Sequence, residues 1–353
     1  MRKKNILIKL ILSKTFIVFC LVVVLLNFVR LNYFKPVIER KISKAIELPI
    51  KINGDIQLGY VGIFPAIALK NVVVKDVLIE KLEMSPSWVK PNDGSIWHFY
   101  ADAHGLKLQG KNLGDYKFLL YPYKDGFDIP KIKGDIEGAE VEGNLKYLGN
   151  DFVSKLKVAG LSYKNFSDDF EGEFDLDLEI KGKGSNYNQI IRTLSGNALF
   201  VGDRGKIKNS ALKLWGADLI ATILSGKSDL LKLNCVVADL DISNGIVGTK
   251  AFAIDTNEVV ISGKGTINLT DETIKMRIIP KPQNPSFINM NTALNLSGSL
   301  WNPVAVPEAR DMAKKIGSIV LSTVNPVAAV LPLIEQELSN KASLCDKYLK
   351  EKN

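Results

Sequence analysis

The stretch from Phe170 to Ile180 reads FEGEFDLDLEI and alternates apolar with acidic residues, with one glycine in an apolar position. Successive side chains of a β-strand point to opposite faces, so this period of two places the apolar residues on one face and the carboxylates on the other. The carboxylates lack the Asp-x-Asp-x-Asp-Gly spacing of a calcium loop, which favours a solvated face over a cation site. The stretch therefore predicts a half-buried antiparallel strand.

The same period of two recurs elsewhere in the chain. It runs from Ile50 to Leu58 and from Val259 to Leu269, and it resumes from Ile274 to Ile278 after a polar turn, which predicts a hairpin. Helical spacing is confined to residues 36–47, 187–194, 210–224 and 307–347. Few helices are thus available to cover many apolar strand faces. Two solutions remain open: two sheets packed face to face, or one sheet curled into a trough whose apolar inner wall needs an apolar occupant.

Charge is concentrated at one end of the chain. The 353 residues carry a formal charge of +8, but residues 1–30 hold six basic residues and no acidic one. The remainder is nearly neutral, with 40 basic against 38 acidic residues, so the composition does not support nucleic-acid binding. Three cysteines and two histidines exclude a disulfide-dense scaffold and a four-cysteine zinc site.

The N-terminus has the pattern of a membrane anchor. Residues 15–29 read TFIVFCLVVVLLNFV between Lys14 and Arg30, and the basic residues that precede them place the N-terminus in the cytoplasm. A cleaved signal peptide would need a small-x-small site, and residues 27–33 offer none. We therefore expect a single-pass protein of the inner membrane with its bulk in the periplasm, if the host has two membranes.

The predicted organisation follows from these patterns. It comprises a cytoplasmic N-terminus (residues 1–14), a transmembrane anchor (15–31), an amphipathic linker helix (33–48), a β-groove domain (49–305) and a C-terminal helical segment (306–353). Residues 316–334 carry no charge, but their polar residues and two prolines favour a buried or membrane-surface helical hairpin over a second span.

Each short motif that could indicate a catalytic or metal site lacks a feature that such a site requires. Residues 221–228, ATILSGKS, resemble a phosphate-binding loop but begin with alanine and follow a helical pattern. Ser210 and Lys213 match S-x-x-K without the partner motifs of penicillin-binding enzymes. His98 and His104 share a strand face but would lie about 20 Å apart along it, too far for one metal ion. The sequence therefore predicts no catalytic residue, no metal and no cofactor, and we expect the protein not to be an enzyme.

Several short motifs occur in an order and spacing that resemble the AsmA-like family of bacterial inner-membrane-anchored envelope proteins. The N-terminal set is Phe34-Lys35-Pro36, the PIKINGDIQL of residues 49–58, and Phe64-Pro65. The C-terminal set consists of residues 191–206, 233–245, 259–280 and 298–307, the last ending in G-x-L-x-x-P-x-x-x-P. The resemblance covers most of the chain, which would be a short member of the family.

The resemblance implies a long curled β-sheet with an apolar groove, related to bridge-like lipid-transfer proteins. It implies a part in outer-membrane biogenesis, with membrane phospholipid as partner and no catalytic residues. A structural or assembly factor that binds outer-membrane or other envelope proteins through its sheet edges is the alternative. The candidate groove residues on apolar strand faces are Ile52, Ile56, Phe174, Leu176, Leu178, Val259, Ile261, Ile267, Leu269 and Met276.

Two of the three cysteines lie beyond the predicted anchor. Cys235 and Cys345 would share an oxidising compartment, whereas Cys20 lies within the anchor. An isolated pair of this kind is a disulfide candidate.

The charge pattern of the N-terminus yields a prediction about topology. A reporter that is active only in the periplasm, fused after Asn353, should be active because the bulk of the chain follows a single span. Activity of a cytoplasmic reporter at the same position would contradict this topology.

Overall fold

The computed structural model describes residues 31–46, 49–61, 64–87, 91–108, 110–165, 168, 170–208, 230–283 and 293–308. These residues form nineteen strands and a few short helices, so the protein is mainly β. The chain divides into two compact units, residues 1–124 and 125–353. This division falls within residues 49–305, for which the sequence predicts one β-groove domain.

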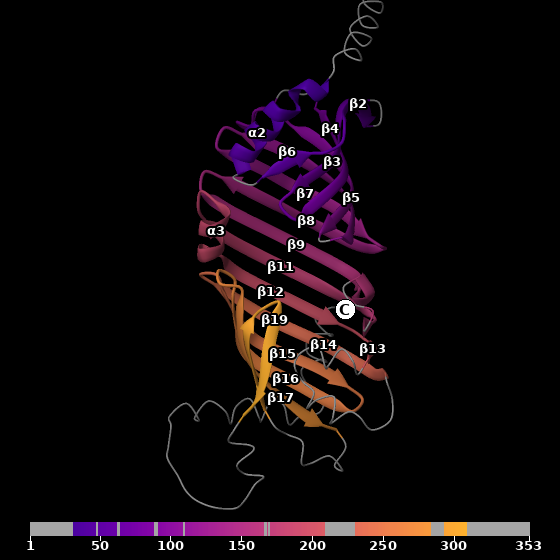
Figure 1. The fold of residues 1–353 in the computed structure, drawn as a ribbon, viewed down its shortest axis with the longest axis vertical. Helices are drawn as coiled ribbons and strands as arrows, with labels where there is room; N and C mark the ends of the chain where they lie inside the picture. The colour runs from indigo at the N-terminus through magenta and orange to yellow at the C-terminus, as the bar shows by residue number, and fades with distance from the viewer. Residues whose placement is uncertain are drawn as a thin grey trace, which may run out of the picture. The chain divides into compact units, whose positions relative to one another are not determined.

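The first unit is an open antiparallel sheet preceded by a short helical segment (Figure 1). The helical segment consists of η1 (Leu31–Phe34) and α2 (Lys35–Ile46), which corresponds to the predicted amphipathic helix. The strands are β1 (Ile50–Ile52), β2 (Ile56–Val61), β3 (Phe64–Val74), β4 (Val77–Pro86), β5 (Phe99–Leu108) and β6 (Lys111–Tyr123). Both β1 and β2 pair with β3, and the order then follows the sequence to β6.

An aligned irregularity crosses this sheet. The break between β1 and β2 at Gly54 lies beside Asn71 of β3. Pairing is interrupted at Asn71 between β3 and β4 and at Gly105 between β4 and β5, and the register shifts next to Gly105 between β5 and β6. Asn71 and Gly105 have positive φ values of 50° and 63°. A Cβ at Gly54 would lie 2.6 Å from the Cβ of Lys70, so the close approach of the two strands requires glycine there. Irregularities of this kind bend a sheet and increase its local twist.

The helical segment covers the part of the first unit's apolar face that lies next to β1 and β2. Ile52 and Ile56 are buried with Leu69 and Val72, and Leu31 of η1 and Ile38 of α2 pack against this cluster. The apolar stripe of α2 therefore closes the core next to β1 and β2, as expected for an amphipathic helix.

Side chains of the same segment also satisfy the exposed edge of the sheet. The backbone N–H of Ile50 donates to the Ser43 hydroxyl (2.9 Å), that of Ile52 to the Glu39 carboxylate (2.7 Å) and that of Ile56 to the Asn32 amide oxygen (2.8 Å). An uncovered strand edge presents unpaired donors that invite another strand. Here those three donors already have acceptors.

The second unit is a larger antiparallel sheet. Its strands are β7 (Gly126–Ile136), β8 (Ala139–Leu148), β9 (Asp151–Ser162), β10 (Phe170–Glu171), β11 (Glu173–Lys183), β12 (Ser195–Gly202), β13 (Gly205–Lys208), β14 (Leu230–Ser243), β15 (Ile246–Thr256), β16 (Val259–Asn268), β17 (Thr273–Pro282), β18 (Leu294–Ser299) and β19 (Asn302–Pro307). Its helices are η2 (Tyr163–Asn165) and α3 (Tyr187–Thr193), the latter capped by the Asn186 side chain.

Pairing in the second unit follows the chain, with one local division. From β7 the order runs through β8, β9, β11, β12, β14 and onward to β19, while β10 pairs with β13 and β13 pairs with the first part of β14. The predicted strand at 170–180 is thus β10 and β11, divided at Gly172, and the predicted hairpin at 259–278 is β16 and β17.

The C-terminal part of the prediction needs one correction. We expected the helical segment to begin at residue 306, but Val306 and Pro307 belong to β19 because they pair with β18, and the Glu308 N–H continues the pairing by donating to the Ala293 carbonyl. Residues 309–353 and the predicted helix at 210–224 lie outside the described residues.

The predicted anchor also lies outside the described residues, except for Leu31, which begins η1. Among the helices that the structure describes, none is long and apolar enough to cross a membrane.

The contacts at the edge of the first unit yield a testable prediction. Replacing Glu39 by alanine removes the acceptor of the Ile52 N–H, which should lower the local opening free energy there by about 1–3 kcal/mol. Hydrogen exchange of the peptide that contains Ile52 measures this change. Glu39→Gln keeps a carbonyl acceptor and should lose less, whereas Lys44→Ala should change nothing. If hydrogen exchange at Ile52 is unchanged in Glu39→Ala, the bond from the Ile52 N–H to Glu39 does not stabilise the edge of the sheet.

Candidate functional site

The candidate site is the apolar face of the second unit, defined as the sheet face that carries Phe174, Leu176 and Leu178 of β11. Cross-strand partners share a face, and Leu176 lies opposite Val158 of β9 and Phe200 of β12. The opposite face, called the charged face below, carries the acidic residues of β11.

No charged side chain enters the apolar face in the strands that the structure describes. The register places on it, for example, Ile129 of β7, Leu145 of β8, Leu240 of β14, Phe252 of β15 and Met276 of β17. The glycines and the few hydroxyl side chains among its members carry no charge. The eleven strands that pair in succession in this unit, β7, β8, β9, β11, β12 and β14 to β19, therefore contribute to one surface that has no ionic group.

Exposed ion pairs connect neighbouring strands on the charged face. These are Lys155–Glu179 (2.7 Å), Lys157–Asp177 (3.0 Å), Lys183–Asp151 (3.3 Å), Lys206–Glu171 (3.1 Å) and Lys250–Asp241 (3.0 Å). Exposed pairs contribute little to stability, but they show which face meets water. The predicted solvated acidic face of residues 171–179 is confirmed.

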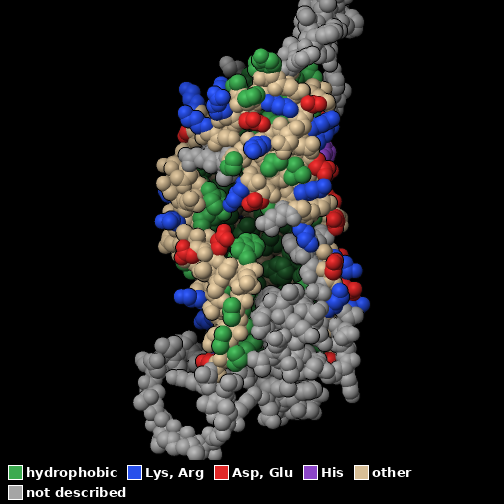
Figure 2. All heavy atoms as spheres, viewed as in Figure 1, with side chains coloured by type: hydrophobic (Ala, Val, Ile, Leu, Met, Phe, Trp, Pro, Cys, Tyr) green, Lys and Arg blue, Asp and Glu red, His purple; other side chains and the backbone are tan. Residues whose placement is uncertain are grey.

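Much of the apolar face is not fully covered by the chain. Leu176, Leu178, Ile267, Leu269 and Met276 are half-buried rather than buried. Figure 2 shows a hollow lined by hydrophobic side chains over the middle strands of this unit. A surface of this kind has apolar area available for an apolar partner.

Helix α3 covers one end of the apolar face. Leu194, Ile242 and Val247 form a buried cluster there, and Ile190 and Ile191 of α3 pack against it. Leu178 and Ile267 lie at the border of this cluster. Helix α3 therefore covers the ends of the strands next to it. It does not cover the middle of the apolar face.

Four aromatic rings lie toward the other end of β11. The Tyr163 ring lies 5.2 Å from that of Phe174, 6.1 Å from that of Phe170 and 6.3 Å from that of Phe200, between ring centroids. The Phe174 and Phe200 centroids are 4.4 Å apart. Rings at these distances attract one another beyond the effect of burial alone.

The hydroxyl of Tyr163 is buried in this cluster and has no hydrogen-bond partner in the part of the chain that the structure describes. It lies directly over Gly202, where a Cβ would overlap it. Burial, helped by the nearby Asp203 carboxylate, raises the pKa of the Tyr163 phenol, so the group stays neutral. An unpartnered buried hydroxyl is uncommon in folded proteins.

The structure separates the ten predicted groove residues into three groups. Ile52 and Ile56 lie in the first unit, in the core that α2 closes. Phe174, Val259 and Ile261 belong to the second unit and are buried, with exposed fractions of 5%, 0% and 3%. The remaining five, which are Leu176, Leu178, Ile267, Leu269 and Met276, are the half-buried members described above.

Sequence reasoning missed several residues of the apolar face. Leu156, Phe200, Leu240 and Phe252 lie on it. Leu156 and Leu240 alternate with charged residues, so a period of two could have identified them. Phe200 and Phe252 lie in unbroken apolar runs, residues 198–201 and 251–254, so alternation does not assign their face. Tyr163 lies in η2, outside any strand, so no period identifies it.

Cys235 lies in β14, is fully buried and forms a disulfide bond. Its predicted partner, Cys345, lies outside the described residues. The pairing of these two cysteines stays a prediction.

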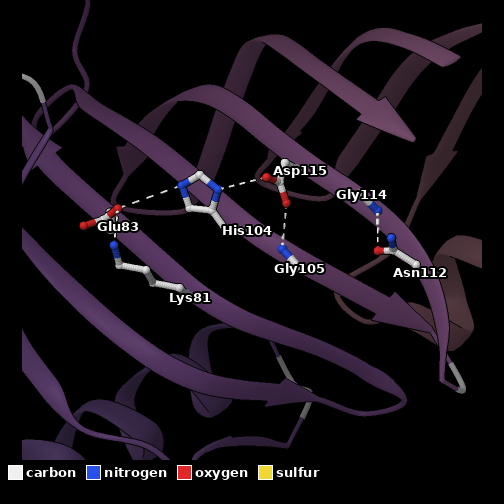
Figure 3. A network of polar contacts seen from close by, with 7 residues as sticks. All are labelled: Lys81, Glu83, His104, Gly105, Asn112, Gly114 and Asp115. Atoms are coloured by element: carbon white, nitrogen blue, oxygen red, sulfur yellow. Dashed lines mark hydrogen bonds and ion pairs between the residues drawn. The ribbon is translucent and has the colours of Figure 1, made fainter. Parts of the chain in front are cut away.

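The two histidines lie in separate polar contacts of the first unit. His104 Nδ1 lies 3.1 Å from an Asp115 carboxylate oxygen and its Nε2 lies 3.9 Å from Glu83, as Figure 3 shows. The Gly105 N–H, together with His104, holds the pKa of Asp115 below its usual range. These contacts support the irregularity at Gly105.

His98 bonds a different carboxylate, that of Asp93 (3.0 Å), and stacks on Tyr121. Within the described residues, no group of three or more His, Cys, Asp or Glu side chains is placed to hold a metal ion. The two histidines share no acidic partner, as expected for side chains that serve local structure.

Comparison with known proteins gives one informative match. The chain is similar to the AsmA family protein YhjG of Escherichia coli (strain K12), with 24% identity over 264 residues. The match covers 70% of this chain and 38% of the relative, so the chain spans well under half of that protein's length. No protein-family model matches the chain, and no solved structure matches it. The match supports the resemblance that the sequence motifs indicated.

The aromatic cluster yields a prediction about stability. Tyr163→Phe removes a hydroxyl without a partner and should leave the free energy of unfolding unchanged or raise it by about 1 kcal/mol. Gly202→Ala should lower it by about 1–3 kcal/mol because the new methyl group meets that hydroxyl. Urea unfolding of both variants and of the double variant measures the coupling between the two sites.

The double variant decides the interpretation. Since removal of the hydroxyl relieves part of the overlap, Gly202→Ala should cost less in the Tyr163→Phe background than in the native one. Strictly additive effects would show that Tyr163 and Gly202 are not in contact.

Proposed function

Since the match to YhjG supports membership of the AsmA-like family, we propose that this chain is a non-enzymatic envelope protein that holds lipid on the apolar face of its second unit. We propose further that an N-terminal anchor holds it in the inner membrane, with the sheet in the periplasm, and that it serves outer-membrane biogenesis. The occupant is a membrane phospholipid, bound through its acyl chains.

The observation that carries the proposal is the half-buried apolar face without an ionic group. Apolar area that stays in water costs about 25 cal/mol per Å², and an acyl chain offers roughly 0.8 kcal/mol for each methylene that it buries. Acyl chains are flexible and have no hydrogen-bonding groups, so a surface of Leu, Ile, Phe and Met side chains needs no polar partner to bind them. Specificity for one lipid over another does not follow from such a surface.

The shape that we propose is a curved groove. β10 and β11 are divided at Gly172, β12 and β13 at Asp203 and Arg204, and β14 has a register shift next to Asn234. The pairings place these three irregularities side by side. Aligned irregularities bend a sheet in one direction, and a bend toward the apolar face would deepen the hollow in Figure 2.

A second candidate function is an assembly factor that binds envelope proteins. The exposed side chains of Trp301, Val304 and Val306 near the edge strand β19 favour it, with exposed fractions of 73%, 58% and 53%. Binding by strand addition would need free N–H groups along that edge.

The edge of β19 is poor in such groups. Because the Glu308 N–H donates to the Ala293 carbonyl, which directly precedes β18, the alternation places the N–H positions of residues 303, 305 and 307 on the free side. Two of these are Pro303 and Pro307, which have no N–H. Together with the occupied edge of β1 and β2, this arrangement favours lipid binding over strand addition.

Photo-crosslinking tests the proposal at neighbouring positions of opposite orientation. A photoreactive amino acid at Leu176 or Met276 should capture phospholipid in the envelope because both side chains lie on the apolar face. The same amino acid at Asp177 or Lys275, one residue away on the charged face, should not. Mass spectrometry of the adducts identifies the lipid.

The buried residues are poor positions for this test. Ile261 is 3% exposed, so Ile261→Asp would bury a charge and destabilise the unit whatever its function. Adducts with protein at Leu176 and Met276, in place of lipid, would favour the assembly factor.

A further inference from the structure

Helix α2 carries two stripes on opposite sides. Ile38, Glu39, Ile42 and Ser43 form the side that faces the sheet, where Ile38 packs on the core and Glu39 and Ser43 accept N–H groups of β1. At 100° per residue, positions 37, 40, 41 and 44 follow the spacing i, i+3, i+4 and i+7 and point the other way. The residues of this outward stripe are Val37, Arg40, Lys41 and Lys44.

The outward stripe is exposed and positively charged. Arg40, Lys41 and Lys44 are exposed and take part in no ion pair in the part of the chain that the structure describes. Glu39 is the one acidic residue of the helix, and it lies on the sheet side with a carboxylate oxygen bonded to the Ile52 N–H. Within the described residues, no acidic side chain on the outward side therefore neutralises the three cations.

Large apolar side chains lie exposed next to these cations. Tyr33 and Phe34 of η1 are 86% and 51% exposed, and Val37 is 48% exposed. Aromatic side chains beside lysine and arginine are typical of segments that lie at the boundary between lipid headgroups and acyl chains.

We infer that the outward stripe of α2, with Tyr33 and Phe34, lies on a membrane surface that contains anionic phospholipid. The cations would meet the phosphate groups, while Tyr33, Phe34 and Val37 enter the boundary region. Because the opposite side of α2 holds the edge of β1, the same helix would fix the first sheet relative to that surface. The inference concerns the first unit and does not depend on lipid binding by the second.

The test uses the full chain reconstituted in vesicles of phosphatidylcholine, with or without phosphatidylglycerol. A photoreactive amino acid at Val37 should label lipid, and the yield should rise when phosphatidylglycerol is present. Reversing Arg40, Lys41 and Lys44 to glutamate should lower that yield on the order of tenfold, because three attractive charges become repulsive.

A matched variant controls for net charge. Lys264, Lys275 and Lys281 are exposed residues of the second unit, and reversing them to glutamate changes the net charge equally but should leave the yield at Val37 unchanged. Hydrogen exchange at Ile52 checks that the reversed helix still holds the edge. If the reversed helix no longer holds the edge, the triple variant Arg40→Gln, Lys41→Gln and Lys44→Gln replaces it, and a smaller loss of yield is expected.

Two outcomes would overturn the inference. One is a yield at Val37 that depends neither on phosphatidylglycerol nor on the charges of α2. The other is labelling of protein instead of lipid in envelope membranes, which would point to an acidic protein partner. A probe at Leu176 in the same samples reports on the apolar face separately, so failure of one proposal is distinguishable from failure of the other.

Discussion

Each side chain of β11 shares its sheet face with its partners on β9 and β12, and this cross-strand register determines what the second unit can do. A shift by one residue in any strand would turn its charged side chains onto the apolar face. The observed register instead keeps ionic groups off one face across the described strands of the second unit and pairs them on the other, as in Lys157–Asp177. The cost of burying an unpaired charge makes the alternatives unfavourable. The surface that we propose for lipid is thus a consequence of strand pairing.

A sheet with one continuous apolar face is open to unwanted partners, and the chain limits them at its edges. In the second unit, two prolines remove N–H groups from the free side of β19. In the first unit, side chains of η1 and α2 accept N–H groups of β1 and β2. The sheet of the second unit is divided at matching places in neighbouring strands, such as Gly172 in β10 and β11. Edges closed to strand addition and a face left partly uncovered together favour a ligand without hydrogen-bonding groups.

The sequence predicted the strands and their orientation well where the period of two was long. β11 and the β16–β17 hairpin fall where alternation predicts them, and α2 and α3 match two of the helical segments. The period of two alone could not distinguish Ile261, which is buried, from Leu176, which is half-buried, because burial depends on strands distant in sequence. Nor could it find Tyr163, which reaches the aromatic cluster from a short helix. The bonds from Glu39 and Asn32 to the sheet edge likewise depend on tertiary placement.

Native mass spectrometry of the full chain, released from detergent, tests most directly whether the apolar face holds lipid. The account predicts that the native chain retains phospholipid, that Leu176→Asp loses it because a carboxylate enters the apolar face, and that Thr266→Asp on the charged face of β16 retains it. Lipid bound equally by all three proteins would place it elsewhere on the chain. Absence of lipid from the native chain would contradict the account.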